Sequence, residues 1–115
     1  MRKAKVYLED IITAMNAIEE FVKDKNFEEF KNNDMLSSAV IRKLEIIGEA
    51  VKNIPKDIVQ GYKEIPWKRM AGMRDRLIHF YFGIKYELVW STIKKDIPKY
   101  KPLIQKILDD LGENK

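Results

Sequence analysis

The sequence predicts an all-α domain, an up-and-down helical bundle of four main helices with short connecting helices. Apolar residues recur every three or four positions along most of the 115 residues, which is the period of one helix face. No segment of useful length alternates with the period of two that is typical of a strand. Because internal repeats and low-complexity linkers are absent, residues 1–115 are expected to form a single domain.

Apolar stripes mark the first two long helices. The first is expected over residues 3–24, and residues 26–32 predict a short helical connector. Asn33 and Asp34 then offer an N-cap for a second helix, which is expected to end at Pro55. The two stripes consist of Leu8, Ile11, Ile12, Met15, Ile18 and Val22, and of Leu36, Val40, Leu44, Ile47, Val51 and Ile54.

A glycine interrupts the second helix. Gly48 lies at an interior helical position, where glycine is about 1 kcal/mol less favourable for the helix than alanine. Its presence predicts that another helix approaches closely at this point.

A short helix and a third long helix are expected next. Residues 56–61 follow Pro55 as a turn and a short helix. Pro66 suits the first turn of a long helix, because its missing N–H would have no intrahelical partner there. This third helix is expected over residues 67–82, with Gly83 as its stop.

The fourth helix is expected to begin near Lys85 and to continue through a proline. Its apolar phase runs on to Leu111 although Pro98 lies inside it. Since proline lacks the N–H that an interior helical position donates, a kink or brief break is expected at Pro98.

Composition excludes several classes of protein and site. The chain has no Cys and a single His, so disulfides, thiol nucleophiles and zinc–thiolate sites are excluded, and no metal or other cofactor is expected. No apolar run approaches the roughly 18 residues that a membrane span requires. The first residues lack the apolar core of a signal peptide, so the cytoplasm is the expected compartment.

Positive charge is concentrated in the second half of the chain. The net charge is +4 overall, with −1 in residues 1–57 and +5 in residues 58–115. Residues 63–106 alone hold 11 Lys and Arg against 4 Asp and Glu. A basic half is what a polyanion-binding surface needs, although a lysine-rich solvated face would look the same.

The stretch from Met73 to Gly83 concentrates reactive side chains. It contains Arg74, Arg76, the single histidine His79 and Tyr81. A histidine can transfer a proton near neutral pH, and an arginine fork suits phosphate oxygens and developing negative charge. RNA supplies its own nucleophile, the 2′-hydroxyl, so these groups would suffice to cut it without a metal. Alternatively, the two arginines only pair with neighbouring carboxylates and His79 is a helix-end histidine.

On a helix, these side chains would not all converge. Arg74 and Tyr81 would share a face, whereas His79 would lie about 140° from Arg74. Asp75 and His79 are four residues apart and would touch, so that the carboxylate would orient the imidazole. A complete site would therefore need the helix to unwind after Ile78 or a second copy of the chain.

Arg74-x4-His79-x-Tyr81 resembles the Arg-x4-His-x-Tyr motif of the HepT toxins of the HEPN superfamily. The resemblance extends over about residues 3–110. Its flanking segments are Ala39-Val40-Ile41-Arg42-Lys43-Leu44-Glu45-Ile46-Ile47-Gly48-Glu49-Ala50, Ile65-Pro66-Trp67, Met70-Ala71-Gly72-Met73-Arg74-Asp75, Tyr86-Glu87-Leu88-Val89-Trp90 and Asp96-Ile97-Pro98.

The resemblance implies a helical homodimer whose two motifs line a shared cleft. It also implies a metal-independent endoribonuclease, the toxin of a toxin–antitoxin pair, whose partner is a minimal nucleotidyltransferase antitoxin. Arg74 and His79 would be the catalytic pair, with Asp75 in support. Tyr81 would be the residue to which the partner transfers AMP, which would silence the enzyme.

Two further expectations concern surfaces near the motif. Lys68, Arg69, Arg76 and Lys85 flank or lie within it and are expected to contact RNA phosphates, the alternative being ordinary surface charge. A dimer interface is expected beside the motif because apolar bulk is plentiful there, in Trp67, Met70, Met73, Phe80 and Phe82. Two other functions stay open, namely a non-catalytic module that binds nucleotide or RNA, and a purely structural dimer.

Overall fold

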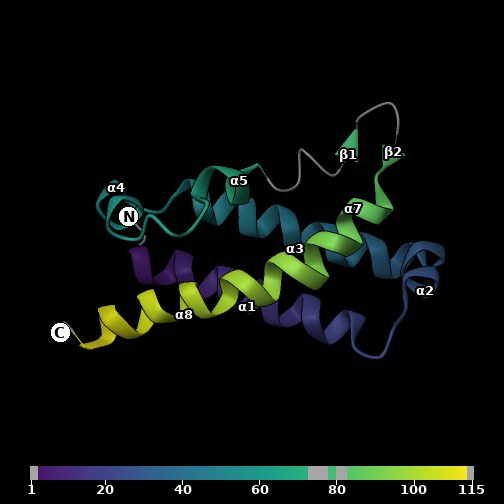
Figure 1. Cartoon of the computed structure of the whole chain (residues 1–115), viewed down its shortest axis with the longest axis horizontal. Helices are drawn as coiled ribbons and strands as arrows, with labels where there is room; N and C mark the ends of the chain where they lie inside the picture. Colours follow the sequence, from purple (N-terminus) through teal and green to yellow (C-terminus); the bar gives the residue numbers. More distant parts are fainter. Residues whose placement is uncertain (1–2, 73–77, 80–82, 114–115) are drawn as a thin grey trace.

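Three long helical segments form the body of the molecule (Figure 1). The computed structural model describes residues 3–72, 78–79 and 83–113. Helix α1 (Ala4–Val22) packs against both α3 (Asp34–Lys52) and α8 (Ile97–Glu113). The expected all-α helical bundle is confirmed.

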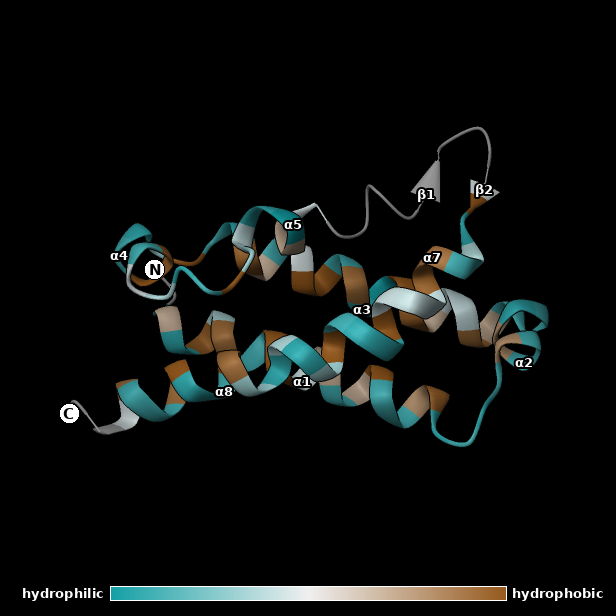
Figure 2. Ribbon diagram, in the orientation of Figure 1, coloured by the Kyte–Doolittle hydropathy of each residue, from teal (hydrophilic) through white to brown (hydrophobic). Residues whose placement is uncertain are grey.

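The core consists largely of the apolar stripes that the sequence predicted. Apolar positions of α1, α3 and α8 face one another in Figure 2. The largest fully buried side chains on these helices are Leu8, Ile11, Met15, Ile18, Leu44, Ile47, Ile97, Ile104 and Ile107. Burying such a side chain stabilises the fold by about 1.5–3 kcal/mol relative to leaving it exposed, so these stripes determine how the long helices pack.

Side-chain caps define the first connection. Helix α2 (Phe27–Asn32) begins with a capping box, in which the Glu29 N–H donates to Asn26 Oδ1 over 2.8 Å and the Asn26 N–H donates to Glu29 Oε1 over 3.1 Å. The N–H of Leu36 donates to Asn33 Oδ1 over 3.0 Å, which caps α3 and confirms the predicted start of the second long helix.

An aromatic cluster joins α2 to the last helical segment. The ring of Phe30, which is fully buried, lies 5.3 Å from the Trp90 ring and 6.2 Å from the Tyr86 ring between centroids. Phe27 meets Trp90 edge to face at 6.2 Å. These contacts hold the short helix α7 (Tyr86–Ser91) against α2.

The chain stays helical from α7 to α8 through a wider turn. Residues Thr92–Asp96 form a π-helical segment, η1, in which the Ile97 N–H donates to the Thr92 carbonyl five residues earlier. The irregularity expected at Pro98 is therefore a π-helical turn just before it, not a break. Helix α8 also contains a second proline, Pro102.

The predicted third long helix begins as expected at Trp67 but is wrong at Ile78–His79. The short helix α4 (Lys56–Gly61) forms as expected, but α5 covers only Trp67–Ala71. Ile78–His79 instead form strand β1, which pairs antiparallel with β2 (Gly83–Ile84) and sets His79 opposite Gly83. Gly83 has φ +81°, a left-handed conformation that serves a hairpin as well as a helix end. The same glycine is thus compatible with both structures.

Gly48 allows α5 to lie directly on α3. A Cβ built on Gly48 would be 2.9 Å from the Ala71 carbonyl oxygen and 3.7 Å from that of Met70. The close approach predicted from this glycine is confirmed. On its other side α5 contributes to the core, since Met70 is fully buried and the Trp67 Nε1–H donates to the Tyr62 carbonyl over 3.0 Å.

The loop before α5 is also tied to α8. The Tyr62 hydroxyl donates to the Asp110 carboxylate over 2.6 Å, and this hydrogen bond raises the pKa of Tyr62. Helix α5 is therefore held by the core, by α3 and, through Tyr62, by α8.

Replacing Gly48 by Ala should displace α5. The new methyl group would collide with backbone, which cannot rotate away, so we expect a loss of about 1–3 kcal/mol in the free energy of unfolding. Denaturant unfolding measures this change. Gly61→Ala is the matched control, because nothing lies within 4 Å of its Cβ position. Equal stability of the two variants would contradict the close approach.

Candidate functional site

The segment between α5 and β2 contains the residues that the sequence singled out. His79 has its backbone in β1, paired with Gly83. Arg74, Asp75, Arg76 and Tyr81 lie outside the described residues. Because His79 belongs to a strand, the helical arguments for a shared face of Arg74 and Tyr81, and for a contact between Asp75 and His79, no longer apply.

Both flanks of this segment are anchored to the bundle. On the first, Ala71 rests against Gly48 of α3. On the second, Ile84 of β2 packs against the core and the Val89 N–H donates to the Lys85 carbonyl over 3.0 Å as α7 begins. Figure 1 shows the hairpin at the start of α7, outside the three long helices. The bundle therefore acts as a scaffold that presents the strand bearing His79 at its surface.

The predicted phosphate-binding cations fall on both sides of the segment. Lys68 and Arg69 are exposed neighbours on α5, and Lys85 is exposed at the start of α7. The Arg69 Nη2 donates to Asp96 Oδ2 over 3.4 Å, which links α5 to η1. Arg69 is thus already engaged by a carboxylate. Lys68, by contrast, forms no ion pair with the residues that the structure describes.

The prediction that apolar side chains near the motif form a dimer interface is partly wrong. Met70 is 0% exposed and Trp67 is 8% exposed, so both belong to the core of one chain and offer little surface to a second copy. Met73, Phe80 and Phe82 lie outside the described residues.

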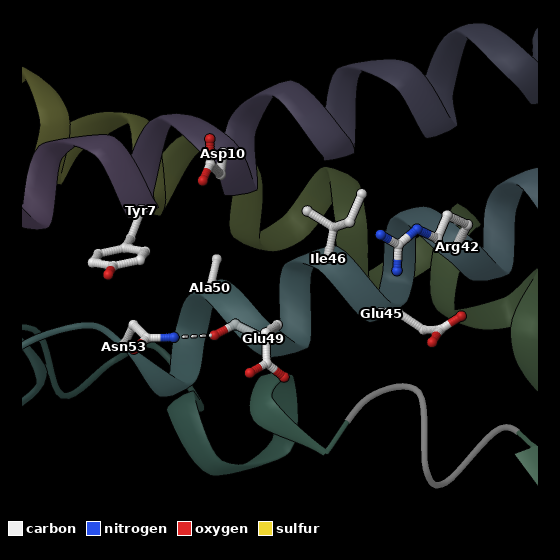
Figure 3. Close-up of a pocket in the computed structure, with 8 residues that line it drawn as sticks. All are labelled: Tyr7, Asp10, Arg42, Glu45, Ile46, Glu49, Ala50 and Asn53. Carbon is white, nitrogen blue, oxygen red and sulfur yellow. Dashed lines mark hydrogen bonds between the residues drawn. The ribbon is translucent and has the colours of Figure 1, made fainter. Parts of the chain in front are cut away.

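A polar pocket of about 460 Å³ lies between α1 and α3 (Figure 3). Its lining includes the carboxylates of Asp10, Glu45 and Glu49, and Arg42 is the one basic residue among the described residues that line it. The remaining lining residues are Tyr7, Ile46, Ala50 and Asn53. The Asn53 Nδ2 donates to the Glu49 carbonyl over 2.9 Å and closes the end of α3. Such a surplus of carboxylates repels phosphate, so this pocket is a poor candidate for a polyanion.

A second hollow, of opposite character, lies between α4 and α5. This α4–α5 groove has a volume of about 510 Å³ and is mainly apolar. The described residues that line it are Val59, Gln60, Lys63, Pro66, Trp67, Lys68 and Arg69, and these include three cations and no carboxylate. Sequence reasoning missed Lys63 and Gln60, because single polar residues in a short helix and a loop give no periodic signal.

Metal and membrane features are not seen in the described part of the chain. Residues 3–72, 78–79 and 83–113 form no group of three His, Asp or Glu side chains that would hold a metal ion. Within the same ranges, no helix combines the length and apolarity that crossing a bilayer demands.

The chain thus combines a helical bundle with an Arg-x4-His motif in its sequence, from Arg74 to His79. Residues 11–107 match the family described as Ribonuclease HepT-like, which is most of the chain, so the protein belongs to this family and is an endoribonuclease by class. The matched range includes all of α3, most of α1 and α8, and the whole motif.

Relatives of similar length support this assignment. The chain is 54% identical over 112 residues to a protein of Methanocaldococcus jannaschii named as a candidate RNase, covering 97% of each chain. It is 51% identical over 106 residues to a probable ribonuclease HepT of Thermococcus cleftensis, covering 92% of this chain and 96% of the relative. A candidate RNase of Caldanaerobacter subterraneus is 45% identical over 108 residues. No solved structure gives a significant match.

Replacing Gly83 by Ala should disturb the hairpin and leave the bundle intact. A non-glycine residue at φ +81° is strained by about 1–2 kcal/mol, although space around the position is open. The strain raises the free energy of the hairpin conformation in which RNA is cut. We expect RNA cleavage to slow by about tenfold, because about 1.4 kcal/mol added to the activation free energy corresponds to that factor in rate. The thermal midpoint should change little. Gly112→Ala, which also enters open space, is the control, and full activity of Gly83→Ala would show that the hairpin conformation is not required.

Proposed function

We infer that this ribonuclease cuts RNA internally and without a metal ion, by attack of the 2′-hydroxyl on the adjacent phosphate. Membership of the Ribonuclease HepT-like family, with Arg74 and His79 both present at the motif spacing, is the observation that supports this most directly. The position of His79 on a surface hairpin suits a long substrate, because RNA would not need to enter an enclosed cavity.

In the proposed reaction, the 2′-oxygen forms a bond to phosphorus and the bond to the 5′-oxygen breaks. The 2′-hydroxyl loses a proton and the leaving 5′-oxygen gains one. The products are a 2′,3′-cyclic phosphate and a 5′-hydroxyl. His79 transfers one of these two protons, and Arg74 stabilises the charge that develops on the phosphate oxygens.

A two-fold homodimer is part of the proposal. A single histidine transfers one proton at a time, whereas the reaction moves two, so a second motif beside the first would supply the missing group. The resemblance to HEPN proteins, in which two motifs share a cleft, supports this arrangement. The proposed compartment is the cytoplasm, where an RNA-cutting toxin meets its targets.

Replacing His79 by Ala should slow cleavage by about 10²–10⁴-fold, because a positioned proton donor or acceptor contributes this much. Cleavage of a labelled RNA in the presence of EDTA measures it, and end-group analysis should show cyclic phosphates. A substrate with a 5′-sulfur leaving group, which needs no proton, separates the two roles. If the variant cuts this substrate at the wild-type rate, His79 is the acid, and if it stays slow, His79 is the base.

Other products would contradict this mechanism. Cleavage that requires Mg²⁺ and leaves 5′-phosphates would overturn it. RNA binding without any cleavage by the wild-type protein would favour the non-catalytic binding module instead. Lys31→Ala, an exposed change on α2 away from the motif, is the control and should cut normally.

We further propose that the enzyme is the toxin of a toxin–antitoxin pair and that a minimal nucleotidyltransferase controls it through Tyr81. Transfer of AMP joins the tyrosine oxygen to the α-phosphorus of ATP and releases pyrophosphate. The added phosphate is negatively charged, so it would compete with RNA for Arg74 and repel substrate phosphates. Tyr81 is two residues from His79 in the sequence, which supports an effect on the reacting groups.

Tyr81→Phe should give an enzyme that the nucleotidyltransferase cannot silence. The change removes the hydroxyl and almost no volume, so RNA cleavage should stay within about tenfold of wild type. Mass spectrometry after incubation with partner and ATP should find AMP on the wild type and none on the variant. Tyr86→Phe is the matched control, since Tyr86 packs on Phe30 in the aromatic cluster and should leave silencing unchanged. AMP on Tyr86, or full silencing of Tyr81→Phe, would refute the assignment.

A further inference from the structure

The α4–α5 groove combines an apolar floor with cationic edges. Val59, Pro66 and Trp67 provide the floor, and Lys63 and Lys68 lie at its edges with exposed side chains. Arg69 also borders the groove but pairs with Asp96. Among the residues that the structure describes, none that lines the groove is acidic, in contrast to the carboxylate-rich pocket between α1 and α3. The groove is therefore complementary to a ligand that is both flat or apolar and negatively charged.

A nucleotide of single-stranded RNA joins a flat base covalently to a negatively charged phosphate. Its base has an apolar face that stacks on flat side chains, and its phosphate attracts lysine. The amide of Gln60, which is exposed at the same groove, offers a donor and an acceptor for the edge of a base. The floor is fixed before binding, because the Trp67 ring is held by its hydrogen bond to the Tyr62 carbonyl.

The position of the groove relates it to the reacting groups. Lys68 and Arg69 lie in α5, the helix that leads through Gly72 into the Arg74–His79 motif. Gly72 lies five positions after Trp67 in the sequence, a rise of about 8 Å along a helix. The contact of Ala71 with Gly48 fixes α5 against α3, so the groove keeps a constant distance from Gly72, two positions before Arg74 in the sequence. An RNA strand held at the groove would thus be directed toward the motif.

We propose that the α4–α5 groove is a substrate subsite that holds one unpaired nucleotide of the RNA, at a distance from the scissile phosphate. The base packs on Val59 and Pro66, with the small exposed part of the Trp67 ring at the bottom of the groove. Lys63 and Lys68 contact its flanking phosphates, and Gln60 hydrogen bonds to the base edge. The proposal rests on the inferred ribonuclease reaction for its substrate class, and it assigns Lys63 and Gln60 to substrate binding.

Binding of an uncleavable RNA tests the subsite separately from catalysis. The probe is a single-stranded oligonucleotide with 2′-O-methyl groups, which remove the nucleophile. The test variant is Lys63→Gln combined with Lys68→Gln. The control is Lys5→Gln combined with Lys31→Gln, which removes the same charge from exposed positions on α1 and α2. Fluorescence anisotropy at several salt concentrations gives the dissociation constant and its salt dependence.

We expect the test variant to bind about tenfold more weakly than wild type and the control to bind like wild type. The slope of log affinity against log salt should fall by about 1.4, since each single-strand phosphate contact contributes about 0.7. A probe with abasic positions should bind wild type at least about fivefold more weakly, because stacking of a base is lost. A probe with photoactivatable 4-thiouridine should cross-link to peptides within residues 59–68.

Three results would overturn the subsite. One is equal affinity and salt slope for the test and control variants, and another is equal affinity for the normal and abasic probes. The third is a test variant that binds the probe normally but no longer binds the nucleotidyltransferase, which would make the groove a docking site for an acidic protein segment. Wild type that binds at the groove yet never cuts natural RNA would contradict the proposed nuclease and leave the subsite intact.

Discussion

The contact between Gly48 and the Ala71 carbonyl determines where the functional segment begins. A five-residue helix such as α5 is not stable alone, so its position depends entirely on packing. Gly48 lets its backbone lie on α3, while Met70 and Trp67 enter the core from the same short helix. The exposed Lys68 and Arg69 and the end of α5 at Gly72 are placed by this packing.

The described surface divides into hollows of opposite charge. The pocket between α1 and α3 has three carboxylates, whereas the α4–α5 groove has three cations. A polyanion is repelled by the first and attracted by the second. The division follows the sequence, because the first half of the chain is slightly acidic and the second half is basic.

Features of the fold that depend on local sequence signals were predicted better than features that depend on tertiary contacts. Asn33 capped α3 as expected, because a cap depends on residues within one turn. The interior glycine, Gly48, correctly indicated close packing. The helix expected over residues 67–82 begins at Trp67 as expected but was wrong at Ile78–His79, since the pairing of β1 with β2 is decided by hydrogen bonds that helical periodicity does not reveal. Trp67 and Met70 were expected at an interface and proved to be core.

The sequence by itself determined the helical bundle, its apolar stripes, the basic second half and the family motif, because periodicity, charge and motif spacing are properties of the chain alone. Tertiary structure decided that α5 is short, that His79 lies in a hairpin, and that Lys63, Gln60 and Trp67 meet at one groove. The physical reason is that both the length of a marginal helix and the assembly of a groove depend on contacts between segments, such as those of α5 with α3 and of Tyr62 with Asp110.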